Sequence, residues 1–218
     1  MEPIIKVTYQ ATNQLYKANQ FLREIEQHNI FAADFEAAIK YTPAELESFK
    51  QELEQNPTKR RRIELESKLA ATALDHPSHT VLTHCQLAIN DHEAFVFILD
   101  SKKLTDRILT FLTTTEKRQI WHNASYDFRQ IHYRTGKFPK LYEDTQLRAK
   151  CILNHTDPQQ ALTGLKHLAG HRYGNWAISA DNFTVEQMYD PQVLQYAATD
   201  PCATMWLWNS ISKHVETH

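Results

Sequence analysis

Two carboxylates near the N-terminus stand where a cation could hold them together. Asp34 and Glu36 end an apolar run that starts at Ile30 and is typical of a buried strand. Side chains alternate along a strand, so both carboxylates project to the same side. Adjacent carboxylates repel each other, and a fold tolerates that cheaply only in water or around a positive ion. The pair therefore predicts either a solvated strand end or part of a metal site.

Two further acids and a tyrosine stand in motifs that could bring them to the same place. Asp127 follows the run Trp-His-Asn-Ala-Ser-Tyr, at the start of a predicted helix. Tyr196 and Asp200 are four residues apart, so on a helix they share a face. Each also has an ordinary structural interpretation: a first-turn acid for Asp127, a core aromatic for Tyr196 and an N-cap for Asp200. Pro201, directly after the last acid, is expected to break or restart the helix there.

In this order the motifs resemble those of a known family, the DEDD 3′–5′ exonucleases of the DnaQ-like superfamily. Asp-x-Glu on the first core strand, His-Asn-x-x-x-Asp and Tyr-x-x-x-Asp resemble the three motifs of its tyrosine-bearing branch, which includes the RNase D group. Residues 143–154 and 164–169 are similar to the segment between the second and third motifs, above all in the proofreading domains of family A DNA polymerases. The resemblance covers the chain from about residue 4 onward, apart from residues 42–75.

The resemblance implies an enzyme that hydrolyses the terminal phosphodiester bond at a 3′ end and releases nucleoside 5′-monophosphates. Two divalent ions, Mg²⁺ or Mn²⁺, about 4 Å apart can supply this chemistry, and several carboxylates are needed to hold them. By the family pattern, Asp34 bridges both ions, while Glu36 and Asp200 complete the site on the nucleophile side. Asp127 holds the second ion, directly or through water. Tyr196 orients the attacking water, because a phenol with a pKa of about 10 is a poor base at neutral pH.

Substrate contacts follow from the same resemblance. His122 and Asn123 precede the second acid, where family members touch the terminal nucleotide. Ile39 or Tyr41, just past the first pair of acids, is placed to stack on or wedge beside the last base. Core packing is an equally good interpretation of these two residues. Phe35, between the two carboxylates, is expected to face the core.

The resemblance to proofreading domains favours single-stranded DNA as the substrate, and we expect either a stand-alone nuclease or a proofreading subunit of a separate DNA polymerase. The chain also ends soon after the third motif, where those enzymes continue into a polymerase domain. Two alternatives stay open. One is an RNase D-like RNA 3′ exonuclease with the same site. The other is a non-catalytic nucleic-acid-binding or polymerase-accessory module.

Composition narrows the classes of function. With 218 residues, the chain suits a single domain spanning 1–218. No stretch approaches the roughly 18 apolar residues of a membrane span, so no membrane partner is expected. A net charge of −2 argues against a general electrostatic grip on nucleic acid. Three separated cysteines favour a reducing compartment, and we expect a cytoplasmic protein, in the host cytoplasm if the chain is viral.

Apolar spacing predicts alternating strands and helices, which is an α/β fold. The predicted strands span residues 4–8, 30–36, 80–89, 94–99, 119–122 and 141–143. The predicted helices span residues 11–27, 101–114, 125–134, 147–153, 165–171 and 193–211. With the family resemblance, this order implies a ribonuclease H-like mixed sheet flanked by helices.

A charged segment, residues 42–75, predicts a helical hairpin inserted into this domain. Thr-Pro-Ala-Glu at its start has the form of a capping box, and Asn56-Pro57 separates two helical stripes. Its basic run at residues 59–62 is most often a solvated helix start, although contact with nucleic acid or a partner protein is an alternative.

Three other residues have chemical potential but a simpler interpretation. Asp144 follows a short predicted strand and is expected to cap the next helix. His167 and His171 have the i, i+4 spacing of a zinc site. No third ligand is evident near them in the sequence, so an ordinary amphipathic helix is favoured.

Overall fold

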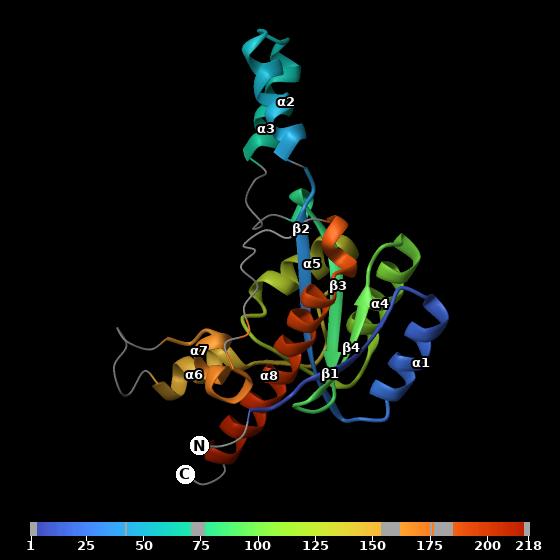
Figure 1. Cartoon of the computed structure of the whole chain (residues 1–218), viewed down its shortest axis with the longest axis vertical. Coiled ribbons are helices and arrows are strands. Elements are labelled where there is room, and N and C mark those ends of the chain that lie inside the picture. Colours follow the sequence, from blue (N-terminus) through green and yellow to red (C-terminus); the bar gives the residue numbers. More distant parts are fainter. Residues whose placement is uncertain are drawn as a thin grey trace.

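A computed structural model of the chain describes residues 4–41, 43–70, 77–153, 162–174, 176 and 185–215. Within these ranges the chain folds into a six-stranded mixed sheet with helices on both faces (Figure 1). The strands are β1 (Thr8–Thr12), β2 (Ile30–Ile39), β3 (Thr80–Ala88), β4 (Glu93–Ile98), β5 (Arg118–Trp121) and β6 (Tyr142–Asp144). The helices are α1 (Leu15–Ile25), α2 (Pro43–Glu54), α3 (Lys59–Ala70), α4 (Lys102–Thr114), α5 (Ser125–Thr135), α6 (Thr145–Leu153), α7 (Leu165–Tyr173) and α8 (Pro191–Val215), with short 3₁₀ turns η1 (Pro77–His79) and η2 (Val185–Tyr189). The predicted α/β fold is confirmed.

Strand β2 occupies an interior position in the sheet. The strand order is β1-β4-β3-β2-β5-β6, and β2 pairs antiparallel with β3 along its length. On its other side β2 pairs in parallel with β5, but only over residues 30–32. Among the described strands, none lies beside that edge of β2 further along. Side chains from other elements can therefore reach the backbone of β2 there.

The alternation of side chains along β2 sorts its residues between two cores. Phe31 and Phe35 are buried in a core that includes residues of α1 and α4. Ala32 belongs to a second core on the opposite face, which includes residues of α7 and α8. Asp34 and Glu36 share the face of Ala32, so α8 is the helix that covers them. The predicted inward orientation of Phe35 is confirmed.

Strand β1 begins at Thr8, so the strand predicted over residues 4–8 is wrong. Ile5 and Val7 pack against the core on the α8 side, which explains the alternating pattern. The N–H of Ile5, however, donates to the carbonyl of Arg172 at the end of α7, at 2.7 Å. The side chains of this segment therefore alternate in burial although its backbone bonds to the end of helix α7.

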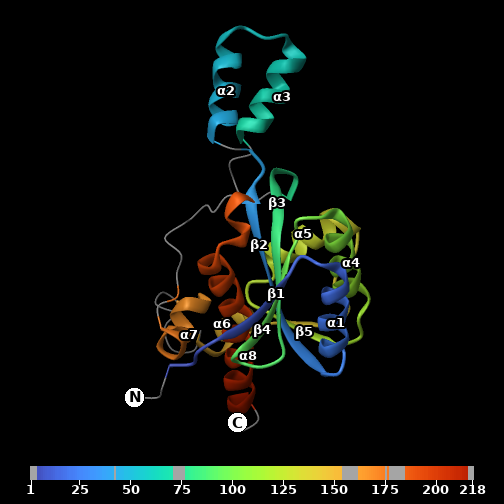
Figure 2. The same cartoon turned by 45° about the vertical axis from the view of Figure 1, so that its right-hand side comes forward.

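Helices α2 and α3 form a hairpin that projects away from the sheet at the end of β2 (Figures 1 and 2). They match the predicted insertion, of which residue 42 and residues 71–75 lie outside the described part. At its base, the ring of Tyr41 packs edge-on against Phe49 of α2, with centroids 5.3 Å apart. This contact joins the end of the strand to the hairpin.

The basic run of α3 is only partly solvated. Lys59 and Arg60 are exposed at the start of α3, as the sequence interpretation expects. Arg61 instead forms two hydrogen bonds with Glu52 of α2, at 2.7 and 2.8 Å, and one with Glu64 at 2.9 Å. This arginine therefore holds the two helices together.

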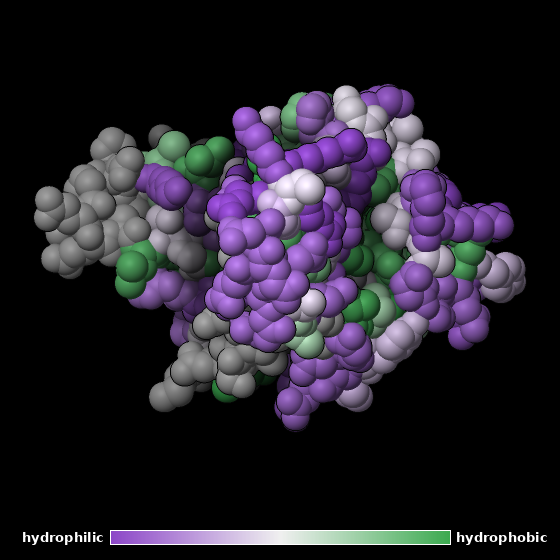
Figure 3. Space-filling view, turned by 90° about the horizontal axis from the view of Figure 1, so that it is seen from above, coloured by the Kyte–Doolittle hydropathy of each residue, from purple (hydrophilic) through white to green (hydrophobic). Residues whose placement is uncertain are grey.

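Seen from above, hydrophilic side chains cover most of the end of the molecule that carries the hairpin (Figure 3).

Helix α8 runs without a break through Pro201, so the predicted break or restart is wrong. Proline removes one backbone hydrogen bond. The helix survives because residues on both sides of the proline, including Ala198 and Cys202, are buried against the sheet. Asp200 consequently lies inside the helix and is not an N-cap.

In the described part of the chain, none of the helices has the length and apolar character that crossing a membrane requires.

Candidate active site

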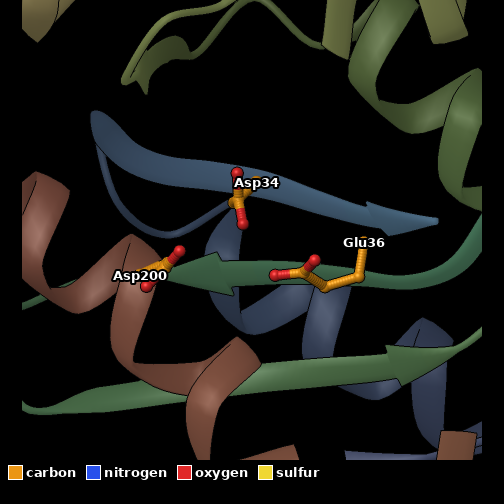
Figure 4. Close-up of side chains that lie close together, drawn as sticks. All are labelled: Asp34, Glu36 and Asp200. Atoms are coloured by element: carbon orange, nitrogen blue, oxygen red, sulfur yellow. The ribbon is translucent and has the colours of Figure 1, made fainter. Parts of the chain in front are cut away.

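Three carboxylates from β2 and α8 meet at one place. Oxygen atoms of Asp34, Glu36 and Asp200 all lie within 4.8 Å of one another. In the close-up, the three side chains point toward a common space between the strand and the helix (Figure 4). Asp200 is buried, whereas Asp34 and Glu36 are partly exposed. The structure thus brings together three of the four acids predicted to hold metal.

Local backbone geometry explains this convergence. Asp34 and Glu36 project from the same face of β2 because they are two residues apart. The pairing of β2 with β3 shifts register between Glu36 and Ala37, which marks a β-bulge directly after the second carboxylate. A bulge redirects the strand at that point, and bulges are common beside functional sites.

The fourth predicted acid, Asp127, lies at the unpaired edge of β2. It is buried in the first turn of α5, and its Oδ1 accepts a hydrogen bond from the N–H of Phe35 at 3.1 Å. Asp127 therefore contacts the strand between the two β2 acids. It is not part of the three-carboxylate group, and one of its oxygens already has a backbone partner.

Burial and mutual repulsion make this group of acids hard to ionise. The pKa of Asp34 is raised well above its usual range, first by burial and then by the charges of Asp127, Glu36 and Asp200. Burial, followed by the charge of Asp200, raises the pKa of Glu36 to about 8. The pKa of Asp127 also rises to about 8, mainly through burial. Without a bound metal ion, the four acids cannot all be charged at neutral pH.

A lysine and a tryptophan that sequence reasoning missed lie against Asp200. The Nζ of Lys166, in the first turn of α7, donates to Asp200 Oδ2 at 3.0 Å. The indole N–H of Trp176 donates to Asp200 Oδ1 at 2.5 Å. Burial raises the pKa of Asp200, and these donors oppose that rise. The only sequence signal was that Lys166 belongs to the Gly-Leu-Lys-x-Leu-Ala segment of the family resemblance.

Tyr196 lies one helical turn before Asp200, as predicted, and is half-buried. Lys166 Nζ donates to its hydroxyl oxygen at 2.7 Å, so the lysine links the tyrosine to the carboxylate. Burial and the nearby carboxylates raise the pKa of Tyr196 above its usual range. The phenol is therefore protonated at neutral pH, which is compatible with the predicted positioning role and argues against a general base.

His122 and Asn123 lie in the turn that leads into α5. The Nδ1 of His122 is 2.9 Å from Thr145 Oγ1, and burial lowers the pKa of the histidine to about 4, so the ring is neutral at pH 7. Asn123 is exposed and has a left-handed backbone, with φ of 60°. Asparagine adopts that conformation more readily than most residues. Contact of either residue with substrate stays a prediction.

The remaining candidates have structural partners or fall outside the described side chains. Ile39 ends β2, but its side chain is not among those described. The ring of Tyr41 is engaged by the hairpin, so base stacking by this residue stays a prediction. His171 is exposed and packs edge-on against Trp206 of α8 at 5.3 Å. The amphipathic interpretation of that helix therefore accounts for His171.

One carboxylate orders the turn that presents Asp127. Both oxygens of Asp144 accept backbone N–H groups from that turn, at 3.1 Å from Asn123 and 2.9 Å from Ala124. Its Oδ1 also accepts from Gln146 and Leu147 at the start of α6, which confirms the predicted N-cap. Asp144 thus fixes the start of α5 relative to α6.

We expect Asp144→Ala to lower the free energy of unfolding by about 2 kcal/mol or more, because it leaves several backbone donors without their charged acceptor. Urea denaturation at pH 7 measures this loss. Asp106→Ala is the matched control, because Asp106 is an exposed acid within α4 that pairs only with Lys102 on the surface. Equal losses for the two variants would contradict the prediction.

Solved structures of similar fold include NrnC, RNase D and the catalytic core of RRP6. NrnC from Brucella melitensis with bound Mg²⁺ is 16% identical, and the match covers 98% of this chain and 83% of that chain, with a TM-score of 0.59. Escherichia coli RNase D, an exoribonuclease involved in structured RNA processing, is 13% identical over 97% of this chain and 46% of its own, with a TM-score of 0.57. The catalytic core of RRP6 from Trypanosoma brucei is 10% identical over 98% of this chain and 49% of its own, with a TM-score of 0.58.

These matches establish the fold. They confirm the ribonuclease H-like sheet, and they agree in fold with the resemblance to DEDD 3′–5′ exonucleases. The chain spans about half the length of the RNase D and RRP6 structures. No protein-family model matches the chain, and no curated protein matches it in sequence. The narrower resemblance to polymerase proofreading domains stays a prediction.

Proposed function

We propose that this chain is a metal-dependent 3′–5′ exonuclease. The observation that carries the proposal is the meeting of Asp34, Glu36 and Asp200 within 4.8 Å, with Asp127 of α5 hydrogen-bonded to the backbone of the same strand. Acids that repel one another inside a fold lower its stability unless a cation binds them, and such groups of acids are typical of functional sites. The fold is shared with solved nucleases, which supports the same reaction class.

The donor set fits Mg²⁺ or Mn²⁺. All three groups that meet are carboxylates, the ligands that these hard cations prefer, and no histidine or cysteine belongs to the group. Asp34, Glu36 and Asp200 would hold the ions, with Asp127 assisting from α5. When bound, two such ions supply a water-derived nucleophile and stabilise the leaving oxygen. NrnC, which shares the fold, has been solved with bound Mg²⁺.

The protein's own groups then position the reactants. Lys166 holds Asp200 and the hydroxyl of Tyr196 by direct hydrogen bonds. Its ammonium group is also the one cation beside the acids among the contacts of the described residues, so it can contact a non-bridging phosphate oxygen. Tyr196, which keeps its proton, can orient the attacking water through its hydroxyl group. His122, Asn123, Ile39 and Tyr41 remain the proposed contacts to the terminal nucleotide.

The sequence resemblance and the fold neighbours support different substrates, DNA and RNA respectively. The sequence segment between the second and third motifs favours single-stranded DNA and, with it, a proofreading role beside a separate DNA polymerase. The fold neighbours favour the alternative, because E. coli RNase D is described as an exoribonuclease. NrnC has also been solved with the dinucleotide pGG. We therefore propose a nuclease for single-stranded 3′ ends, with DNA first and RNA as the second candidate.

One assay tests both levels of this proposal. Matched 5′-labelled DNA and RNA oligonucleotides are incubated with the protein and Mg²⁺ or Mn²⁺, with and without a chelator. We expect a ladder shortening from the 3′ end that the chelator abolishes. Faster digestion of RNA would reverse the choice of sugar. Absence of digestion of either substrate with either ion would overturn the nuclease itself and favour a non-catalytic binding module.

A further inference from the structure

A groove separate from the acid group lies between the ends of β2, β3, α4 and α5. Its volume is about 450 Å³, within the range of ligand-binding pockets. Lys40, Lys102 and Arg134 line it together with Tyr133 and a single carboxylate, Asp100. We call it the α4–α5 groove. It concentrates positive charge in a chain whose net charge is −2.

Two of its cations have no carboxylate partner among the described residues. The guanidinium of Arg134, half-buried, donates to the side chain of Gln130 at 2.6 Å and to the carbonyl of Thr80 at 3.1 Å, both neutral acceptors. Lys40 is exposed at the end of β2. The carboxylate of Asp100, in contrast, is already held by Asn13 and by the hydroxyl of Tyr189. These neutral donors leave the charge of Asp100 in place, but Lys40, Lys102 and Arg134 outnumber it, so the lining of the groove is positive overall.

An aromatic ring stands beside these cations. Tyr133 of α5 is 57% exposed and lines the groove. Exposed aromatic rings interleaved with lysine and arginine are the recurring means by which proteins bind single-stranded nucleic acid, because every base has a face that can stack. A small anion alone would need the cations but not the ring.

Two elements connect the groove to the acid group. Along α5, Arg134 lies seven residues after Asp127, on the same face of the helix and about 10 Å further on. Lys40 directly follows the end of β2, four residues after Glu36 and at most about 13 Å from it. The groove lies on the α4–α5 side of the sheet and the β2 acids on the α8 side, so a nucleic-acid strand whose 3′ end lies at the acids would reach the groove within a few nucleotides by passing the edge of β2 at Asp127.

We propose that the α4–α5 groove binds the upstream part of a single-stranded nucleic acid, several nucleotides from the 3′ end held at the acids. This rests on the proposed exonuclease function. Tyr133 stacks on a base, and Lys40 and Arg134 contact phosphates. The groove thereby makes binding depend on substrate length, since a very short oligonucleotide occupies only the acid site.

Binding of 5′-labelled oligonucleotides to the full chain tests this. Asp34→Asn protein serves as the background, so that the substrate is not consumed. Tyr133→Ala and Lys40→Gln are added singly, since both side chains are exposed and Arg134 is needed to hold α5 to β3. Lys103→Gln is the matched control, an exposed lysine of α4 that does not line the groove. Dissociation constants for a 10-mer and a 3-mer are measured by fluorescence anisotropy, in DNA and in RNA.

We expect Tyr133→Ala to weaken binding of the 10-mer about fivefold or more. Lys40→Gln should weaken it severalfold and lower the slope of log affinity against log salt concentration by about 0.7. The 3-mer and the Lys103→Gln control should change less than about twofold. Unchanged 10-mer binding, or equal losses of affinity for both lengths, would overturn the proposal that the groove binds nucleic acid. A failed nuclease would show instead as undigested substrate with wild-type protein, whatever the binding result.

Discussion

Replacing Asp34 with asparagine is expected to abolish metal-dependent digestion and, at the same time, to make the metal-free protein harder to unfold. The first effect follows because the other three acids all act electrostatically on Asp34, and because by the family pattern its loss removes a ligand that both ions would share. A fall of at least about a thousandfold in kcat/KM is expected. The second effect follows from the repulsion that the remaining acids exert on Asp34.

The gain in stability has a defined cause. Burial and the charges of Asp127, Glu36 and Asp200 raise the pKa of Asp34, so at pH 7 the folded state must either protonate this group or hold its charge, and both cost free energy. Asparagine has nearly the same shape and no charge, so it removes that cost. For a chain of this size, each kcal/mol gained raises the melting temperature by about 2–4 °C.

Two measurements check these outcomes together. Digestion of a labelled oligonucleotide in Mg²⁺ gives the activity, and thermal unfolding with a chelator at pH 7 gives the stability. Asp106→Asn provides the matched control, because it makes the same change at an exposed ion pair. Activity that survives in Asp34→Asn would remove the acid group from the mechanism. A lower melting temperature would show that the carboxylate is stabilised in the fold rather than strained.

The acids and the tyrosine of the candidate site could be predicted from the sequence because they follow local spacing rules and occur in the order of the family motifs. Alternation along one strand places Asp34 and Glu36 on one face whatever the rest of the fold does. Helical spacing does the same for Tyr196 and Asp200. That these two pairs meet is not a local property, and the sequence predicted it only through the order of the family motifs.

The errors arose where tertiary packing overrides a local rule. Proline breaks an isolated helix, but α8 continues through Pro201 because its neighbours are buried against the sheet. Residues 4–8 alternate like a strand, but the backbone of Ile5 bonds to the end of α7. In both cases the competing contacts come from residues far away in the chain, which pattern reading does not include.

Lys166 and Trp176 could not be assigned from the sequence for a related reason. Neither residue type is a metal ligand, and nothing in their spacing relates them to Asp200. Their place beside it depends on how α7 and the residues after it pack against α8. The family resemblance included the segment of Lys166, but a shared segment does not reveal which side chain faces the site.

The stability of the metal-free protein is expected to fall as the pH rises from about 6.5 to 8, which is opposite to ordinary acid denaturation. Burial and neighbouring charges raise the pKa values of Glu36 and Asp127 to about 8, whereas both groups ionise near 4 in the unfolded chain. Between these values the folded state binds more protons than the unfolded state. Stability must therefore decrease with rising pH, by about 1.4 kcal/mol per pH unit for each proton retained.

The pH range from about 6.5 to 8 is chosen so that the carboxylates, and not the histidines, dominate the change in stability. Burial lowers the pKa values of His122 and His84, so these groups make stability rise with pH, but only up to the pKa of about 6.5 of an unfolded histidine. Their contribution levels off within about one pH unit above that value, so they oppose the carboxylates only in the lower part of the window. Lys166, the cation that faces the acids, offsets part of their repulsion. The remaining slope therefore belongs to the carboxylates.

Urea denaturation at pH 6.5, 7.25 and 8 with a chelator measures this slope. Glu36→Gln should flatten it, because the variant has one fewer carboxylate to deprotonate, and the matched exposed change Glu116→Gln should leave it as in the wild type. Added Mg²⁺ should reduce or reverse the slope, because metal binds the deprotonated carboxylates and stabilises the fold more as the pH rises. A metal-free stability that is flat or increases across the window would mean that the four acids are ionised in the fold without a cation. The electrostatic reason for placing a metal ion among them would then be lost.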